Sequence, residues 1–481
     1  MMLISDNACF GGAGLEALEA RVKHELELLS YPGRDWVIPR TAPDGSEALN
    51  VLVIGGGQGG VAVAAKLGLE RVRGVRVVDA NPAGQAGPWV TFARMITLRT
   101  PKHVSGPDLE VPALTVRAWY EAQHGSGTWD AVGLIPKETW NDYLCWVRRM
   151  FGVQLSSDTR AGTIHYDPAS GLFEVPLTSP KGEERVWTRR VVLATGIEGS
   201  GDWAVPAIIK DALPQERYAH TRWPIDFDAL VGKRIGVIGA GASAFDNASV
   251  ALENGAAEVH LFFRRKRLVT VNPYRWAEFV GFLKHHADLS DADRWRFVQQ
   301  IVKMGQLPPA DTFRRATAHE GFHLHPGCGV EKVEPTQQGL VLKAGGESYD
   351  LDFLIVGTGF VTDLSRRKEL AELEGKLLRW QDVYTPPVER RNADLERHPY
   401  LGSHFEFLPR DEADGFVRFV FNYTFGSWLS MGFGGSSISG MKYSVARIVA
   451  GITKSFYTED LEQYFHGLES FAAEEFSVDD E

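Results

Sequence analysis

The chain has 481 residues, of which 44% are hydrophobic and 23% are charged, and its formal net charge is −11. This length allows two or three domains with a large core. The acidic balance argues against nucleic acid as a partner, and no apolar run reaches the ~20 residues that a membrane span needs. The first residues lack a basic segment followed by an apolar one, so we expect no secretory signal and a cytoplasmic protein.

The three cysteines, Cys9, Cys145 and Cys328, lie far apart and form no C-x-x-C pair. This spacing predicts neither a redox dithiol nor a zinc site. His323 and His325 precede Cys328, but an intervening proline–glycine pair and the missing fourth ligand indicate incidental loop residues. We therefore expect no metal site.

Near the N-terminus, apolar residues recur at steps of three and four, which predicts an amphipathic helix over residues 12–30. We expect residues 1–50 to form a helical extension that covers either a core face or a neighbouring subunit. A homo-oligomer is therefore one expectation. The apolar positions are Leu15, Leu18, Val22, Leu26 and Leu29.

A first glycine-rich loop follows the apolar run Val51–Ile54. A strand that turns through G-x-G-x-x-G into a helix lets the backbone approach a pyrophosphate, which then binds the helix N-terminus. A second strand over 75–79 ends in an acid, where a carboxylate receives ribose hydroxyls and repels a 2′-phosphate. The alternative for this acid is a solvated strand end. The unit predicts FAD or NAD, bound by Gly55, Gly57, Gln58, Gly60, Asp79 and Ala80.

The segment between the two glycine-rich loops begins with a stretch rich in proline and glycine, residues 81–115. Helices are predicted over 116–124 and 137–151. Alternating runs near 162–166 and 172–177 predict a small antiparallel meander. The strand predicted from Arg190 has the apolar run 191–194 and returns to a parallel sheet that is buried on both faces. Thr195 and Gly196 follow this run.

A second glycine-rich loop follows the strand predicted over 234–238. The next strand, 258–263, ends in two arginines rather than an acid. Guanidinium groups recognise a 2′-phosphate through bidentate, charge-assisted bonds, so this unit predicts NADPH. The alternative is a solvated charge run. The residues expected at this site are Gly239, Gly241, Ala242, Ser243, Arg264 and Arg265.

Helices over 276–286 and 292–304 and short strands near 340–343 complete the second unit. The apolar run 352–356 then enters Gly357-Thr358-Gly359, which repeats the earlier Ala194-Thr195-Gly196 pattern. A last helix is predicted from Ser439-Gly440 to about Lys454. The acidic end, residues 474–481, is expected to be a solvated tail.

These motifs together resemble the class B flavoprotein monooxygenases, which comprise flavin-containing, Baeyer–Villiger and N-hydroxylating enzymes. The paired loops carry the resemblance, with the 194–196 motif and Asp352-x₃-Val-Gly-Thr-Gly-Phe360. Gly87-Pro-Trp89 is similar to the family's G-G-x-W, and Thr100-Pro-Lys102 with Gly106-Pro-Asp-Leu109 is similar to T-N-x-P-K…F-P-D-F. The family's linker signature is half present, at His220 and Trp223. The resemblance covers roughly residues 50–455.

The resemblance implies an α/β fold with two Rossmann-type dinucleotide-binding domains, of the glutathione-reductase kind, with parallel sheets and small antiparallel meanders. We expect an FAD-binding domain over 51–222 and 351–481, and an NADPH-binding domain over 223–350 inserted within it. The substrate should bind in the cleft between them. The cofactor-binding set then also includes Trp89, Thr195, Gly196, Gly357, Thr358, Gly359 and Gly440.

The resemblance further implies an FAD- and NADPH-dependent monooxygenase. It would insert one oxygen atom from O2 into a small organic substrate at nitrogen, sulfur or a carbonyl carbon, through a C4a-peroxyflavin. Arg99 is expected to hold the peroxide and His220 to position the nicotinamide, unless they are a surface arginine and a hinge histidine. The helix that opens at Gly440 would place its N-terminus near the flavin. The alternatives are a flavin-dependent NAD(P)H oxidoreductase for a quinone or another acceptor, and a non-catalytic dinucleotide sensor.

Overall fold

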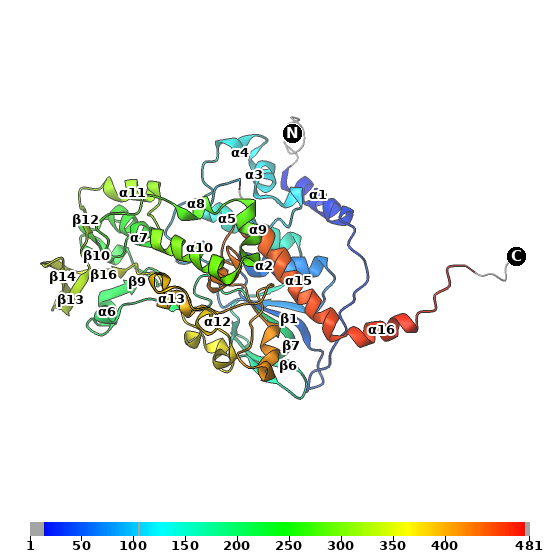
Figure 1. Cartoon of the computed structure of the whole chain (residues 1–481). Coiled ribbons are helices and arrows are strands. Elements are labelled where there is room, and N and C mark those ends of the chain that lie inside the picture. The colour runs from blue at the N-terminus through cyan, green and yellow to red at the C-terminus, as the bar shows by residue number, and fades with distance from the viewer. Residues whose placement is uncertain (1–13, 104–105, 477–481) are drawn as a thin grey trace.

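Two sheets built on parallel strands organise the chain, one for each glycine-rich loop (Figure 1). The computed structural model describes residues 14–103 and 106–476. Cys9, the start of the predicted extension and the end of the acidic tail lie outside these ranges. Within them, no helix combines the length and the apolar character needed to span a bilayer.

The first sheet has eight strands in the order β3-β2-β1-β7-β6-β4, with β18 beside β7 and β5 beside β6. β7 joins the predicted meander to the parallel part of this sheet. Its first half pairs antiparallel with β6, and its second half pairs parallel with β1. The strands are β1 (Leu49–Ile54), β2 (Val75–Val78), β3 (Leu155–Ser156), β4 (Arg160–Ala161), β5 (His165–Asp167), β6 (Leu172–Ser179), β7 (Gly182–Leu193) and β18 (Val420–Asn422).

The second sheet is entirely parallel, in the order β12-β11-β10-β16-β9. A three-stranded antiparallel sheet, β13-β14-β15, packs on one face of it, and β8 pairs with β17. The strands are β8 (Gly201–Trp203), β9 (Tyr218–His220), β10 (Arg234–Ile238), β11 (Glu258–Phe263), β12 (Phe322–Pro326), β13 (Val330–Pro335), β14 (Leu340–Ala344), β15 (Glu347–Leu351), β16 (Phe353–Val356) and β17 (Phe360–Thr362).

Strand pairing corrects the placement of two strands. Both β9 and β16 fall in the segments that we assigned to the FAD-binding domain, yet both are strands of the second sheet. The short sequences of these two strands contain no signal that indicates which sheet they join. By strand pairing, the second unit therefore starts before Tyr218 and ends after Val356.

The helices cover the sheets and connect the two units (Figure 1). α2 and α15 pack together on the first sheet, and α7 packs on the second with α11 beside it. The helices are α1 (Gly14–Leu28), α2 (Gln58–Leu69), α3 (Val116–His124), α4 (Thr128–Ala131), α5 (Lys137–Met150), α6 (Ala207–Lys210), α7 (Ala242–Glu253), α8 (Pro273–Trp276), α9 (Val280–His285), α10 (Asp291–Met304), α11 (Ala310–Thr317), α12 (Trp380–Val383), α13 (Ala393–Glu396), α14 (Trp428–Met431), α15 (Met441–Glu459) and α16 (Leu461–Glu469).

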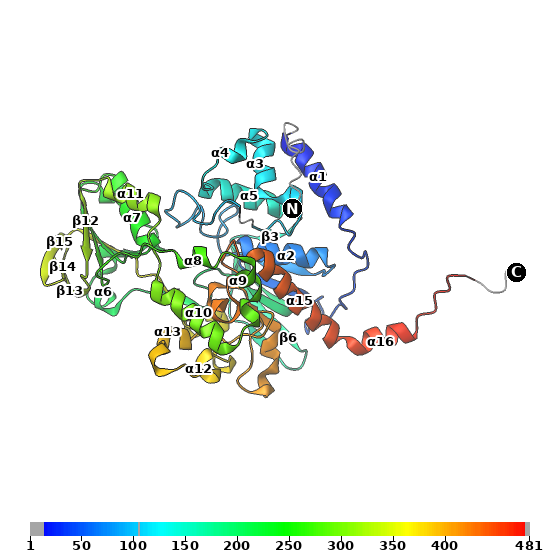
Figure 2. The ribbon, with the colours of Figure 1, turned by 45° about the horizontal axis from the view of Figure 1, so that its top comes forward.

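Two predicted helices differ in detail. The helix expected over 276–286 is broken into α8 and α9, because Phe279 takes an extended conformation. This break lets the Phe279 ring pack edge to face on Trp276. The last helix runs beyond Lys454 to Glu459, and α16 then extends away from the body of the molecule (Figure 2).

The described part of the N-terminal extension covers a core face of its own chain. Leu18 and Val22 of α1 are buried in a cluster of tryptophans from the α3–α5 region. Glu19 accepts a hydrogen bond from the Trp146 indole at 3.0 Å. The first of the two predicted roles for this helix is therefore the one that the structure supports.

Candidate dinucleotide sites and the junction between them

Two glycines of the first glycine-rich loop, Gly55 and Gly60, are closely packed, whereas Gly57 between them faces open space. A Cβ on Gly55, where φ is +110°, would overlap the carbonyl of Ala194, and one on Gly60 would overlap the carbonyl of Gly55. A Cβ on Gly57 would come no closer than 3.8 Å to any atom, the nearest being the Cα of Gly87. The open position is where a pyrophosphate must approach the backbone.

Asp79 follows β2 directly and is fixed beside this loop by hydrogen bonds. It is buried, and its carboxylate accepts hydrogen bonds from the backbone N–H of Gly56 at 2.7 Å and of Asn81 at 2.8 Å. Ala80 follows it at the surface. The carboxylate is thereby fixed where the fingerprint requires an acceptor for ribose hydroxyls.

Two buried polar atoms near the first loop lack a protein partner. The Trp89 indole N–H and the Thr195 hydroxyl make no hydrogen bond within the described ranges. Gln58, at the start of α2, accepts a bond from the Trp140 indole at 3.3 Å, and no side chain caps the helix. Buried donors of this kind usually have a partner, so the open loop, the uncapped helix and these two atoms fit a bound dinucleotide.

The second loop repeats this plan around β10 and α7. Gly239 has φ +122°, and a Cβ there would overlap the carbonyl of Gly357. Gly241 faces open space, with the nearest atom at 3.7 Å. No side chain caps α7, which begins with Ala242-Ser243. Ala244 fits at the third position because residue 357 opposite is glycine, since a Cβ there would lie 2.8 Å from the Ala244 methyl.

The two arginines after β11 are both exposed but have different surroundings. Arg265 donates to the carbonyls of Met304, at 2.9 Å, and Lys303, at 3.4 Å, at the C-terminal end of α10. Arg264 makes no hydrogen bond or ion pair to any residue of the described ranges. Its guanidinium therefore remains available to a phosphate group, whereas that of Arg265 is partly used by the helix end.

His220 forms a hydrogen bond to the Gly357-Thr358-Gly359 motif that follows β16. Its Nε2 donates to the carbonyl of Gly359 at 2.9 Å, and its Nδ1 accepts the backbone N–H of Arg222 at 3.2 Å. Burial lowers the pKa of His220 to about 4, so the ring is neutral. Because both ring nitrogens are hydrogen-bonded to backbone groups of the protein, His220 is suited to position those groups. Thr358 beside it donates to the carbonyl of Ala204.

Arg99 ties the two units together. Its guanidinium lies 2.5 Å from the carboxylate of Asp246 on α7, which also accepts a bond from Thr312 at 3.1 Å. Burial raises the pKa of Asp246 and the Arg99 charge opposes that rise. The loop that follows β2 is thus attached to the helix that carries the second fingerprint.

The glycines before α15 make close contacts within the protein. A Cβ on Gly440 would overlap the carbonyl of Phe433, and one on Gly435 would overlap that of Tyr423. Gly59 of α2 would contact the carbonyl of Gly435 at 2.8 Å if it carried a Cβ. The segment that leads into α15 therefore packs on the first loop, and α15 starts there without a side-chain cap.

Sequence reasoning missed two residues of this junction, Asp246 and Arg94. Asp246 stands in a helix of mostly small and apolar residues, and that polar position was the available signal. Arg94 donates to the carbonyls of Thr221 at 3.1 Å and Trp223 at 3.2 Å. No local pattern marks Arg94, because its partners lie more than 120 residues away.

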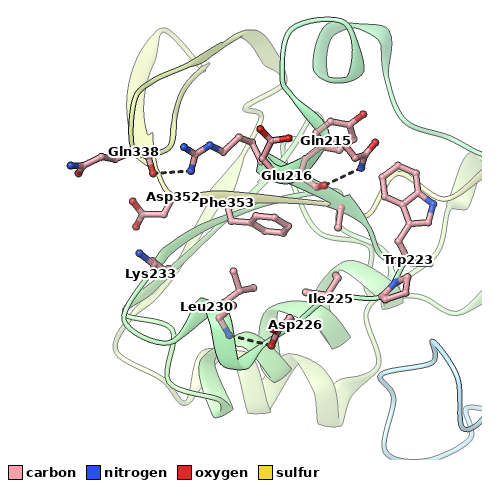
Figure 3. A pocket seen from close by; sticks show the side chains of 15 residues that line it. Gln215, Glu216, Trp223, Ile225, Asp226, Leu230, Lys233, Gln338, Asp352 and Phe353 are labelled. Carbon is pink, nitrogen blue, oxygen red and sulfur yellow. Dashed lines mark hydrogen bonds between the residues drawn. The ribbon is translucent and has the colours of Figure 1, made fainter.

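Two cavities flank these sites. The larger, of about 590 Å³, lies near the amino ends of β9, β10 and β16, between Trp223, Lys233 and Phe353 (Figure 3). Ligands of open parallel sheets bind at the carboxyl ends of the strands, so this cavity is not the dinucleotide site. A second cavity, of about 410 Å³, lies between residues 91–96 and the C-terminal part of α7, at the junction of the two units.

Paired glycine-rich loops, each with its own sheet and strand-end motif, define a flavoprotein with two dinucleotide sites. Comparisons with known proteins agree. Residues 52–198 match the FAD-NAD(P)-binding family model, and residues 131–280 match the L-lysine 6-monooxygenase/L-ornithine 5-monooxygenase model. The chain is 43% identical over 452 residues to the FAD-dependent urate hydroxylase of Xanthomonas campestris pv. campestris, which covers 93% of this chain and 94% of that protein.

The chain therefore belongs to the family of FAD-dependent monooxygenases that contains this hydroxylase. Two solved structures share the fold. The ornithine hydroxylase of Pseudomonas aeruginosa has a TM-score of 0.65 and 16% identity, and the ornithine N-hydroxylase of Kutzneria sp. 744 has 0.63 and 15%. Each match covers 85% of this chain and 99% of the other. The predicted fold class, the monooxygenase class and the binding of FAD with a nicotinamide dinucleotide are confirmed.

Proposed function

We propose that this protein hydroxylates urate or a closely related purine, with O2 and NADPH as co-substrates. One oxygen atom would enter the substrate, and the other would leave as water while NADPH is oxidised to NADP⁺. The observation that carries the proposal is the 43% identity to a urate hydroxylase across almost the whole of both chains. An identity spread over both dinucleotide units and the segments between them covers the substrate region as well.

The junction of the two units has the charge that such a substrate needs. Urate is a planar anion at neutral pH. Arg94 and Arg99 both reach across this junction, and the Arg222 guanidinium lies 3.9 Å from the centre of the Phe92 ring. Arg99 is paired with Asp246, and Arg222 lies 3.7 Å from the Glu198 carboxylate, whereas Arg94 donates to backbone carbonyls. The charge of Arg94 would therefore attract an anionic substrate to this junction.

The bound flavin supplies the oxygen chemistry, and the chain supplies binding, orientation and exclusion of water. We assign the FAD pyrophosphate to Gly57 and the first turn of α2, and its ribose to Asp79. We assign NADPH to Gly241 and the first turn of α7, with Arg264 on the 2′-phosphate. Gly440 would place the start of α15 near the flavin.

We assign positioning roles to Arg99 and His220. Arg99 already bonds to Asp246, so it would act by holding the second unit against the first rather than by binding a peroxide. His220 fixes the carbonyl of Gly359 beside the second loop. The aromatic rings of Phe92, Trp203 and Phe360 pack together beside His220 and would exclude water from the site.

A second candidate is N-hydroxylation of an amine, because residues 131–280 match the lysine and ornithine monooxygenase model. A substrate screen separates the two. The purified enzyme is mixed with NADPH and air-saturated buffer, and NADPH oxidation, oxygen uptake and loss of urate absorbance are recorded together. Xanthine, lysine and ornithine are run in parallel, with a substrate-free sample to measure uncoupled oxidation.

We expect urate to accelerate NADPH oxidation and to disappear in a one-to-one ratio with the oxygen consumed. Stimulation by lysine or ornithine alone, with formation of a hydroxylamine, would select the second candidate. NADPH oxidation that none of these compounds stimulates, together with fast reduction of a quinone, would overturn both.

A further inference from the structure

Three histidines and a glutamate gather on one face of the second sheet, at its β12 edge. The parallel register places His260 of β11 beside His323 of β12, and Phe262 beside His325. Because side chains alternate along a strand, all of these residues point to the same face. The His260 ring centre lies 4.6 Å from that of His323 and 5.2 Å from that of His325.

This arrangement corrects the earlier interpretation of His323 and His325 as incidental loop residues. Both lie within β12, and their spacing of two brings them to the same face. The partner that completes the cluster, His260, is more than 60 residues earlier and is brought there only by strand pairing. The proline and glycine that argued against a site follow the histidines at the end of the strand.

We propose that Glu258, His260 and His323 bind a divalent transition-metal ion of the Zn²⁺, Co²⁺ or Ni²⁺ type. One ligand atom from each residue lies within 4.8 Å of the other two, and all three residues are partly exposed. Small side-chain movements bring such atoms to ~2.0–2.2 Å from a common ion. Two imidazoles and a carboxylate form a ligand set that these metals favour, and partial exposure leaves a position for water.

A hydrogen-bonded chain behind His260 would orient it as a ligand. His260 Nε2 lies 3.1 Å from the Glu258 carboxylate, and His260 Nδ1 lies 3.0 Å from His325 Nε2. His325 Nδ1 in turn lies 3.4 Å from the Tyr349 hydroxyl. With Glu258 ionised, the donors run in one direction, from Tyr349 to His325, from His325 to His260, and from His260 to Glu258.

Binding of the metal by His260 Nε2 reverses this chain without a net change in protons. The His260 proton then resides on Nδ1 and is donated to His325 Nε2. The His325 proton resides on its Nδ1 and is donated to the Tyr349 oxygen. Partners of this kind fix the tautomer of a ligating histidine and raise its affinity for the metal.

The position of the site indicates a structural role. His260 faces the antiparallel β13–β15 sheet, whereas the flanking Val259 and Leu261 face α7. The ligands lie towards the amino ends of the strands, away from the second glycine-rich loop. A bound ion would fasten the edge strand β12 to β11, and through Tyr349 it would stabilise the contact with the small sheet.

The test uses the full-length flavin-loaded enzyme after treatment with a chelator. Calorimetric titration with ZnCl2 should give one equivalent bound, and CoCl2 should produce ligand-field absorption at wavelengths beyond the flavin bands. The thermal midpoint should rise with added metal. His323→Ala should weaken binding at least about tenfold, since loss of an orienting partner alone costs that much.

Glu258→Gln provides a second variant at a more exposed position, and His165→Ala is the matched control. His165 pairs with Glu372 on the surface of the first unit, at 2.7 Å. The control should bind zinc like the wild type, and flavin content should stay normal in all three variants. The proposal is overturned if the wild type binds no stoichiometric metal, or if both cluster variants bind it unchanged.

Discussion

The two glycine-rich loops follow one plan, but their surroundings differ. The first is enclosed by Trp89 on one side and by the segment before α15 on the other, and its acid is buried. The second has an exposed arginine, Arg264, after β11 of the same unit. Enclosure retains a ligand, whereas exposure lets it exchange. The difference supports the assignment proposed above, with a resident flavin in the first site and a nicotinamide dinucleotide that exchanges in the second.

The strongest test of this comparison gives the first loop the methyl group that the second loop already carries. Gly60→Ala brings a Cβ into the carbonyl of Gly55, so we expect loss of bound flavin and of most of the folded protein. The equivalent position in the second loop already carries a methyl, in Ala244. Flavin absorbance per mole of purified protein and the thermal midpoint measure the effect.

The control for this experiment is Ala244→Gly. It removes a methyl from the first turns of α7 and should cost about 1 kcal/mol, with flavin content unchanged. Normal flavin content in Gly60→Ala would show that the first loop is less confined than its geometry indicates.

A smaller effect is expected from the arginines of the second site. Arg264→Ala should raise the KM for NADPH about 10- to 100-fold and leave the KM for NADH almost unchanged, because a charge-assisted bond to the 2′-phosphate is lost. Arg265→Ala is the matched control, since its guanidinium also serves the end of α10. Steady-state kinetics with both nucleotides measure the ratio. Equal KM values for NADPH in the wild type and Arg264→Ala would remove this arginine from the site.

Methyl groups at the two open positions should separate the two cofactors. Gly57→Ala and Gly241→Ala meet no protein atom closer than 3.7 Å, so both variants should fold. Only a ligand would contact the new methyl. We expect Gly57→Ala to weaken FAD binding about tenfold, and Gly241→Ala to raise the KM for NADPH by a similar factor at full flavin occupancy. Equilibrium flavin titration and kinetics measure the two effects, and a KM effect in the first variant alone would reverse the assignment.

Most of the architecture follows from local patterns, and the exceptions share one cause. The units β1–α2–β2 and β10–α7–β11 are each encoded within about 30 residues by a glycine turn and apolar periodicity. The sheet membership of β9 and β16, the Arg99–Asp246 ion pair and the histidine cluster all join segments more than 60 residues apart. A polar residue shows no sign in sequence of which distant partner it will meet, so these features needed the fold.

The last difference between the two units is the expected effect of low pH on their stability. The carbonyl of Gly359 in the second motif accepts a bond from His220 as well as from the backbone N–H of Ala204, both at 2.9 Å. The carbonyl of Gly196 in the first motif accepts backbone N–H groups, from Phe425 at 3.1 Å and Gly199 at 3.4 Å. The pKa of His220 is about 4 in the folded protein against 6.5 when unfolded. The unfolded form therefore binds the extra proton between these values, and stability is lost as pH falls from about 6.5 towards 4.

Hydrogen exchange measures this loss locally. At pH 5.5, one unit below the unfolded pKa, the opening of β9 should be favoured about tenfold relative to pH 7.5, after correction for intrinsic exchange rates. Peptides that cover the end of β7 and Gly196 should change less, because no histidine holds that motif. His220→Gln keeps a donor for Gly359 but does not titrate, so its β9 should lose the pH dependence. If β9 opens with the same pH dependence in His220→Gln and in the wild type, a group other than His220 controls this opening.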